Sequence, residues 1–169
     1  MTHYRVDSAA SRLLVQARSK IHDTRTEFTR ITGEVDADPA ALTERGASAR
    51  FSVDMAAFDA GGWMKNKKLE KDLDLARHPQ ASFELRALRD VVRAADGGFT
   101  ATAVGTLRYR GRELEVTIAG RGRIDDGAIE ASGSFDLDIR QVGMEPPKFL
   151  VFKVEPEVTI EVTLRCRAG

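Results

Sequence analysis

Residues 61–86 read GGWMKNKKLEKDLDLARHPQASFELR and hold the one convincing helical pattern of the chain. Leu69, Leu73 and Ala76 recur there at the i, i+4, i+7 spacing of a single helix face, whereas lysines and acidic residues occupy most other positions. We therefore expect one amphipathic helix over residues 63–76. A single short helix in a chain of strands is more often a lid or plug than part of the core.

Alternation of apolar and polar residues on both sides of this helix predicts β-strands. The period of two is clear in residues 49–55, 82–89, 129–139 and 158–164. Short turn sequences, such as DGG at residues 96–98, join consecutive strands. Because parallel strands need long crossover connections, we expect about eight to nine strands that pair antiparallel.

Each expected strand has one apolar face, so a sandwich and a closed barrel both satisfy the pattern. Several strands run to about ten residues, longer than is usual in sandwiches, which favours a barrel. The apolar faces also carry many small residues, namely Ala17, Ala49, Ala87, Ala101, Ala103, Gly105, Ala131 and Gly133. In a barrel of about eight strands, these residues either leave a cavity for one ligand or accommodate large neighbours across a tight barrel end.

The composition is that of an ordinary globular protein, which we expect to form one domain over residues 1–169. Lys and Arg total 26 and Asp and Glu total 26, and this zero net charge argues against a dedicated nucleic-acid-binding protein. Cys166 is the only cysteine, which excludes an internal disulfide and fits a reducing compartment. Because the first residues show no secretory signal, we expect a cytoplasmic location unless a leader has been removed.

Short motifs occur in a defined order along nearly the whole chain. They are Tyr4-Arg-Val-Asp7 with Ser11, His22, Ile31-Thr-Gly33-Glu-Val35, Lys68-Leu69, Asp72-Leu73-Asp74, Pro79 with Phe83, Gly105-Thr-Leu107 with Gly111, and Phe135-Asp-Leu-Asp-Ile139 with Gly143. In order and spacing, these motifs resemble the YceI-like polyisoprenoid-binding family. The chain differs from the family pattern ahead of the helix leucine, where Lys65, Asn66, Lys67 and Lys68 replace the usual acidic and histidine positions.

The resemblance implies a lipocalin-like, antiparallel eight-stranded β-barrel with one short helical insertion near its mouth. It also implies that the pore binds a long apolar ligand, such as a polyisoprenoid, a quinone or another lipid, and that the role is binding or carriage and not catalysis. The partners that we expect are this ligand, a membrane in transient contact and a second copy of the chain in a homodimer, but no nucleic acid.

Candidate ligand-binding residues are large apolar side chains around the helix, smaller ones on the strands, and one histidine. They are Phe58, Trp63, Met64, Leu69, Leu73, Phe83, Ala103, Gly133, Phe135, Phe149, Phe152 and His22. Phe58, Trp63 and Met64 could close the pore or could be plain core. Phe149 and Phe152 could form the opposite lip of the mouth, a dimer contact or a buried final loop.

Polar residues near the expected mouth have two interpretations each. Lys65, Lys67, Lys68 and Lys71 could face an anionic headgroup or a membrane, although a solvated helix face is the commoner use of such residues. His22 could meet the polar end of a ligand or stabilise a turn. The three histidines of the chain are far apart in sequence, so we expect no metal site and no cofactor.

Two other functions fit the same pattern of strands. One is a small enzyme that uses a histidine or an acidic residue of the pore as a general base, and the other is a packed barrel that acts as an interaction module. The sequence has neither a Gly-x-Ser-x-Gly motif nor a phosphate-binding glycine loop ahead of a helix. Titratable residues that point into the pore would favour the enzyme, and a filled interior would favour the module.

Overall fold

The computed structural model describes residues 1–19, 23–145, 148–149 and 152–169. The candidate His22 and the side chains of Phe149 and Phe152 lie outside what it describes. The strands are β1 Thr2–Val6, β2 Arg12–Ser19, β3 Thr24–Phe28, β4 Ile31–Ala37, β5 Ala47–Asp54, β6 Phe58–Asp59, β7 Gln80–Arg93, β8 Gly98–Tyr109, β9 Arg112–Ile124, β10 Ala128–Asp138, β11 Lys148–Phe149 and β12 Phe152–Ala168. The helices are α1 Trp63–Leu73 and two 3-10 turns, Ser8–Ala10 and Ile139–Val142.

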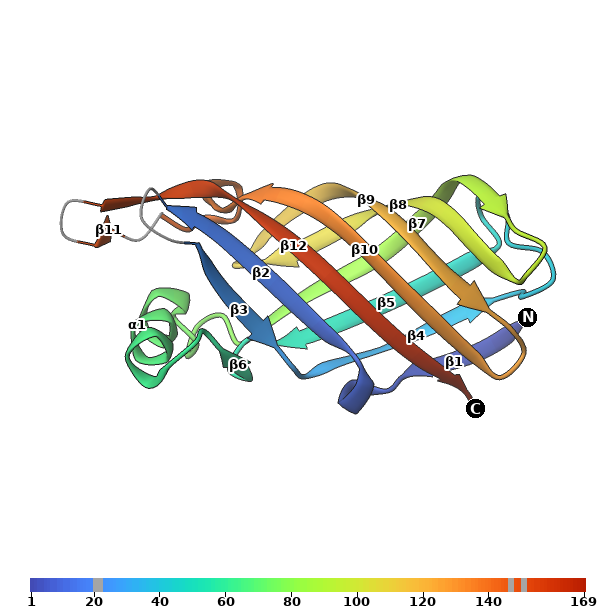
Figure 1. Cartoon of the computed structure of the whole chain (residues 1–169), viewed down its shortest axis with the longest axis horizontal. Coiled ribbons are helices and arrows are strands. Elements are labelled where there is room, and N and C mark those ends of the chain that lie inside the picture. The colour runs from blue at the N-terminus through green and yellow to red at the C-terminus, as the bar shows by residue number, and fades with distance from the viewer. Residues whose placement is uncertain (20–22, 146–147, 150–151) are drawn as a thin grey trace.

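Eight of these strands close into an antiparallel barrel. Their order is β1, β4, β5, β7, β8, β9, β10, β12, and β12 pairs back onto β1. At this closure Tyr4 lies opposite Ala168, and Val6 lies opposite Cys166. Figure 1 shows the long strands winding obliquely around the barrel axis. The predicted antiparallel eight-stranded barrel is therefore confirmed.

Short strands extend the barrel wall at one end. β2 follows β1 after the 3-10 turn, and both strands pair with β12, β1 near its C-terminal end and β2 further back. In the same way, β3 pairs with β2 while β4 pairs with β1. The two-residue strand β6 then pairs with β3 beyond the end of β5. The long β12 therefore supports two shorter strands along one of its edges.

The helix α1 lies in the connection between β6 and β7. Figure 1 shows it beside one end of the barrel, with both chain termini at the opposite end. The predicted range 63–76 is wrong at its C-terminal end, because Asp74 takes a left-handed conformation with a φ of 50° and ends the helix after Leu73. Ala76 consequently lies outside the helix and is exposed. In the described part of the chain, no helix has the length and apolar character needed to cross a bilayer.

Most of the buried apolar residues that the structure describes form two clusters, one toward each end of the barrel. The larger cluster joins α1 to the barrel and contains Leu73, Tyr109, Leu137 and Val142. The smaller cluster lies where β1 meets β12, with Tyr4, Ala37, Ile124, Ile129 and Cys166. Between the two clusters, the inward faces of the strands surround an internal space.

An apolar cavity as the candidate functional site

The barrel encloses a cavity of about 1040 Å³. Its wall consists of alternate residues along the strands, because successive side chains of a strand point to opposite faces. β10 and β12 supply the most regular rows, which are Ile129, Ala131, Gly133, Phe135 and Leu137 on β10 and Val158, Ile160, Val162, Leu164 and Cys166 on β12. The sequence assigned Ile129 to Leu137 and Val158 to Leu164 to inward faces by their period of two, and the structure agrees.

Small side chains create much of this space. Six of the eight predicted small residues line the cavity, namely Ala17, Ala49, Ala101, Ala103, Ala131 and Gly133. Ala87 does not, because an irregularity in the β7–β8 pairing between Leu85 and Ala87 shifts the alternation and brings Leu88 to the cavity instead. Gly105 also does not line the cavity. The ring of Phe83 lies against it, so close that a Cβ atom at residue 105 would collide with the ring. The small residues therefore do not serve only to accommodate large neighbours.

The end of the cavity near the chain termini is closed by the smaller cluster. Tyr4 is fully buried there, and its hydroxyl donates a hydrogen bond to the carbonyl oxygen of Asp125 at 2.6 Å. Cys166 is also buried, and burial raises the pKa of its thiol to about 11. The thiol therefore stays protonated near neutral pH and behaves as a small apolar group.

The other end of the cavity reaches the surface beside α1. Met64, Lys65 and Asp72 line the cavity and are exposed at the same time. Leu69 and Leu73 also line it from α1, and Leu73 is only 3% exposed. A helix that presents both apolar and charged side chains to the cavity thus borders the opening, as the sequence predicted for a helical insertion near the mouth.

A hydrogen bond from a side chain to the backbone holds the C-terminal end of α1 against the barrel. Arg110, in the turn after β8, donates a hydrogen bond from Nη1 to the carbonyl oxygen of Leu73 at 3.1 Å. Its guanidinium also lies 5.9 Å from the ring centroid of Tyr109. At the other end of the helix, Asn66 accepts a hydrogen bond from the backbone N–H of Ala60 at 2.5 Å. The helix is therefore tied to its surroundings at both ends.

Tyr109 contributes an unusual polar group to the cavity wall near α1. Its hydroxyl oxygen is buried and has no hydrogen-bond partner among the residues that the structure describes. Burial raises the pKa of this phenol, and the cation of Arg110 opposes that shift without outweighing it. Tyr109 therefore stays neutral, and its hydroxyl carries a desolvation cost that the nearby Arg110 offsets only in part.

Charged side chains of the cavity lining are not buried. Within the described ranges they are Lys65, Lys68, Asp72, Arg121 and Glu155, and each is exposed or half-buried. The same ranges contain no group of three or more His, Cys, Asp or Glu residues that could hold a metal ion. The described cavity wall is therefore mostly apolar, and its charged side chains lie where water reaches them.

The structure brings seven of the twelve candidate ligand-binding residues to the cavity wall. They are Met64, Leu69, Leu73, Phe83, Ala103, Gly133 and Phe135. Phe58 instead packs on Phe28, with 5.7 Å between ring centroids. Trp63 is 75% exposed and lies outside the lining, so it is neither plain core nor half-exposed in the pore. Whether any of these residues contacts a ligand stays a prediction.

Several large lining residues were absent from the candidates. Phe51, Phe99 and Tyr109 all face the cavity from β5 and β8. Phe51 stood on the inward face in the alternation of residues 49–55, and the same period of two along β8 would have found the other two.

A closed antiparallel barrel with one helix beside the opening of an apolar cavity defines a lipocalin-like binding barrel as the structural class. The family model of the YceI-like domain matches residues 4–166, and the chain belongs to that family. The family predicted from the ordered motifs is therefore confirmed. A search of curated proteins gives no match.

Solved structures show the same fold over nearly the whole chain. BcnA from Burkholderia cenocepacia is 24% identical, with a TM-score of 0.77 over 95% of this chain and 98% of that one. A polyisoprenoid-binding domain from Saccharophagus degradans, implicated in plant cell wall breakdown, is 13% identical, with a TM-score of 0.76 over 100% of both chains. A YceI protein from Campylobacter jejuni is 12% identical, with a TM-score of 0.68 over 89% of this chain and 87% of that one.

Proposed function

We propose that the protein binds one long apolar ligand, such as a polyisoprenoid, a quinone or another lipid, inside the barrel, and that it carries this ligand. The observation that supports the proposal most directly is the cavity of about 1040 Å³, whose described wall is almost entirely apolar. A cavity at the upper end of the usual range for ligand sites suits a long chain better than a compact metabolite. The likeness to a polyisoprenoid-binding domain agrees with this choice.

Desolvation would supply most of the binding free energy. Each methylene that leaves water contributes about 0.8 kcal/mol, so a chain of many methylenes gains affinity without specific polar contacts. Part of this gain offsets the entropy that the ligand loses when it becomes ordered. Selection among ligands would then depend on the length and width of the cavity, which the small residues along the strands determine.

Binding accounts for the site better than the two alternatives. A packed barrel would have a filled interior, whereas this interior is hollow. An enzyme needs an acid or base at the reacting atoms, and the described carboxylates of the lining, Asp72 and Glu155, are both exposed. We therefore propose that the protein is not an enzyme. Residence in the cytoplasm, a single domain and homodimer formation remain predictions from the sequence.

Organic extraction of the purified protein, followed by mass spectrometry, tests the proposal. We expect a long apolar compound in about one-to-one ratio with the protein, because exchange from such a cavity requires the whole chain to re-enter water. Protein freed of lipid should recover thermal stability when an isoprenoid alcohol or quinone is added, by mass action. An extract without any such compound, together with no gain in melting temperature on addition, would contradict the proposal.

A further inference from the structure

The first turn of α1 exposes two large apolar side chains next to each other. Trp63 is 75% exposed and Met64 is 68% exposed. Within the described residues, the exposed large hydrophobic residues are these two together with Met1 and Val92. Single exposed apolar residues are common on soluble proteins, but here two large ones follow each other in the first turn of one helix. Tryptophan is also the residue that most favours the boundary between lipid and water.

Positive charge continues from this apolar turn along the outer side of the helix. Lys67 and Lys71 follow Trp63 at intervals of four residues, and both are exposed. In total α1 carries four lysines against Glu70 and Asp72, whereas the whole chain has no net charge. An apolar edge beside lysines is the arrangement by which surface helices bind bilayers that contain anionic lipids.

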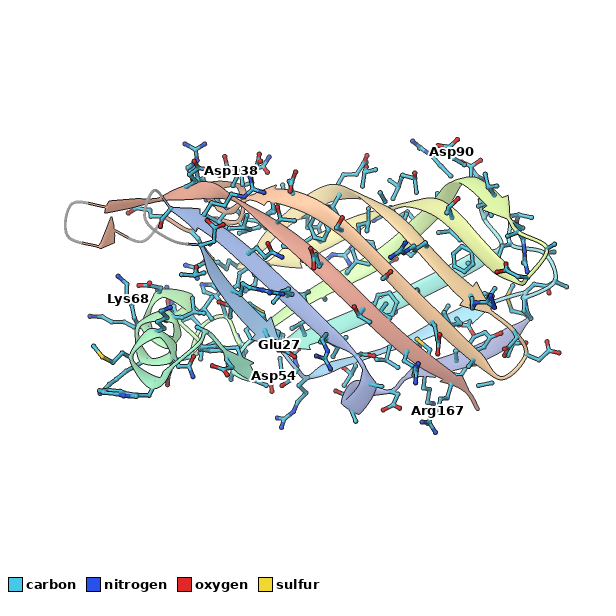
Figure 2. The ribbon with its side chains drawn as sticks, viewed as in Figure 1. Glu27, Asp54, Lys68, Asp90, Asp138 and Arg167 are labelled. Atoms are coloured by element: carbon cyan, nitrogen blue, oxygen red, sulfur yellow. The ribbon has the colours of Figure 1, made fainter. Side chains whose placement is uncertain are left out.

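The same turn borders the opening of the cavity. Met64 is exposed and also lines the cavity, so it joins the outer surface to the interior. Figure 2 shows Lys68 on α1 at one end of the molecule and Asp90 of β7 toward the other end. A flat bilayer that touched Trp63 and Met64 would therefore lie against the opening and far from the chain termini.

We propose that Trp63, Met64, Lys67 and Lys71 form a docking surface for an anionic lipid bilayer. The apolar turn inserts at the level of the lipid headgroups, and the lysines bind their negative charges. Docking places the cavity opening against the membrane, so that an apolar ligand passes between the two without crossing water. This use of the surface rests on the proposed function, whereas the docking itself depends only on the side chains of α1.

Flotation of the protein with lipid vesicles tests the docking surface. We expect binding to vesicles of phosphatidylcholine and phosphatidylglycerol, little binding to phosphatidylcholine alone, and weaker binding as salt rises. Lys67→Glu should weaken binding about tenfold, because it replaces an attraction by a repulsion. The matched control Arg89→Glu reverses a charge on β7, near the labelled Asp90, and should bind as the unchanged protein does.

A second pair of variants separates the apolar contribution from charge. Trp63→Ser should weaken binding to the anionic vesicles, whereas Val92→Ser changes another exposed apolar residue on β7 and should not. Trp63 is the only tryptophan, so a blue shift of its emission with anionic vesicles reports its own insertion. Equal binding by the α1 variants and their controls would overturn the proposal. Failure of the unchanged protein to bind anionic vesicles would also overturn it.

A failure of the docking proposal can be distinguished from a failure of the proposed ligand binding. Uptake of an isoprenoid quinone from solution needs no membrane, so Lys67→Glu should leave it unchanged. Vesicle binding by a protein that takes up no apolar ligand would leave the docking surface standing and refute the cavity as a lipid site. Ligand uptake without vesicle binding would refute only the docking surface.

Discussion

The hydroxyl of Tyr109 is a buried polar group in a mostly apolar cavity wall. It has no described partner, and such a group costs about 1–3 kcal/mol in lost hydration. We expect Tyr109→Phe to leave the free energy of unfolding unchanged or to raise it by up to about 2 kcal/mol. Chemical denaturation of both proteins without ligand measures this difference. A loss above about 1 kcal/mol would show that the hydroxyl makes a stabilising hydrogen bond.

Cys166 allows a second prediction, which concerns pH. Burial raises the pKa of its thiol to about 11, whereas an unfolded cysteine titrates near 8.5. Between these values the unfolded state loses the proton first, so the contribution of Cys166 to stability is complete below about pH 8.5 and falls as pH rises toward 11.

The slope of stability against pH measures this contribution. In Cys166→Ala the fall of the unfolding free energy above pH 8.5 should be shallower by up to about 1.4 kcal/mol per pH unit. Only the slopes are compared, because the substitution also leaves a small void. Equal slopes in the two proteins would mean that the folded thiol titrates like an unfolded one. Rapid reaction of the folded thiol with an alkylating reagent at pH 8 would contradict its burial independently.

Among the secondary-structure elements, α1 is held on the barrel by Arg110. Arg110→Ala removes the hydrogen bond to Leu73 and the cation beside Tyr109, which together should cost about 1–2 kcal/mol. The loss should be local to the helix. Hydrogen exchange should therefore accelerate in residues 63–73 and remain slow in β8 and β9.

Arg112→Ala is the matched control for this prediction. Arg112 donates from Nη1 to the carbonyl oxygens of Arg140 and Gln141, at 3.3 and 3.4 Å, and so holds the second 3-10 turn instead of α1. Its replacement should accelerate exchange near residues 139–142 and leave α1 protected. If the two variants gave the same exchange pattern, Arg110 would not be the specific contact of the helix.

The pattern of residues predicted the elements better than their ends. The period of 3.6 located α1, but the left-handed conformation of Asp74, which ends the helix, has no signal in that period. The period of two located the inward residues of β10 and β12 correctly. It failed at Ala87, because a register shift depends on how β7 and β8 pair and not on β7 alone.

For the whole molecule, the sequence predicted an antiparallel barrel but not the way in which it closes. Alternation and short turns imply neighbouring strands, yet the return of β12 onto β1 joins residues at the two ends of the chain. The closed barrel was predicted from the resemblance of the ordered motifs to the family. The pattern of residues could not show whether the barrel is hollow or filled, because both kinds of barrel have the same alternation of inward and outward residues. Only the summed volumes of the inward side chains in three dimensions separate them.

The central claim is that this interior binds a long apolar chain, and Ala103→Phe tests it most directly. Ala103 lines the cavity, so a phenyl ring there would occupy space that the ligand needs. Gly133 is less suitable, because a Cβ atom there would already lie 2.7 Å from Cγ2 of Ile118. Thr100→Phe places the same ring on the exposed side of β8 and serves as the control.

The measurement is a titration of lipid-free protein with an isoprenoid quinone, alongside circular dichroism to verify the strand content of each variant. We predict saturable one-to-one uptake by the unchanged protein and by Thr100→Phe, and at least about tenfold weaker uptake by a folded Ala103→Phe, because the filled space displaces several methylenes worth about 0.8 kcal/mol each. Equal uptake by a folded Ala103→Phe, or no uptake by the unchanged protein, would contradict the assignment of the cavity as the ligand site.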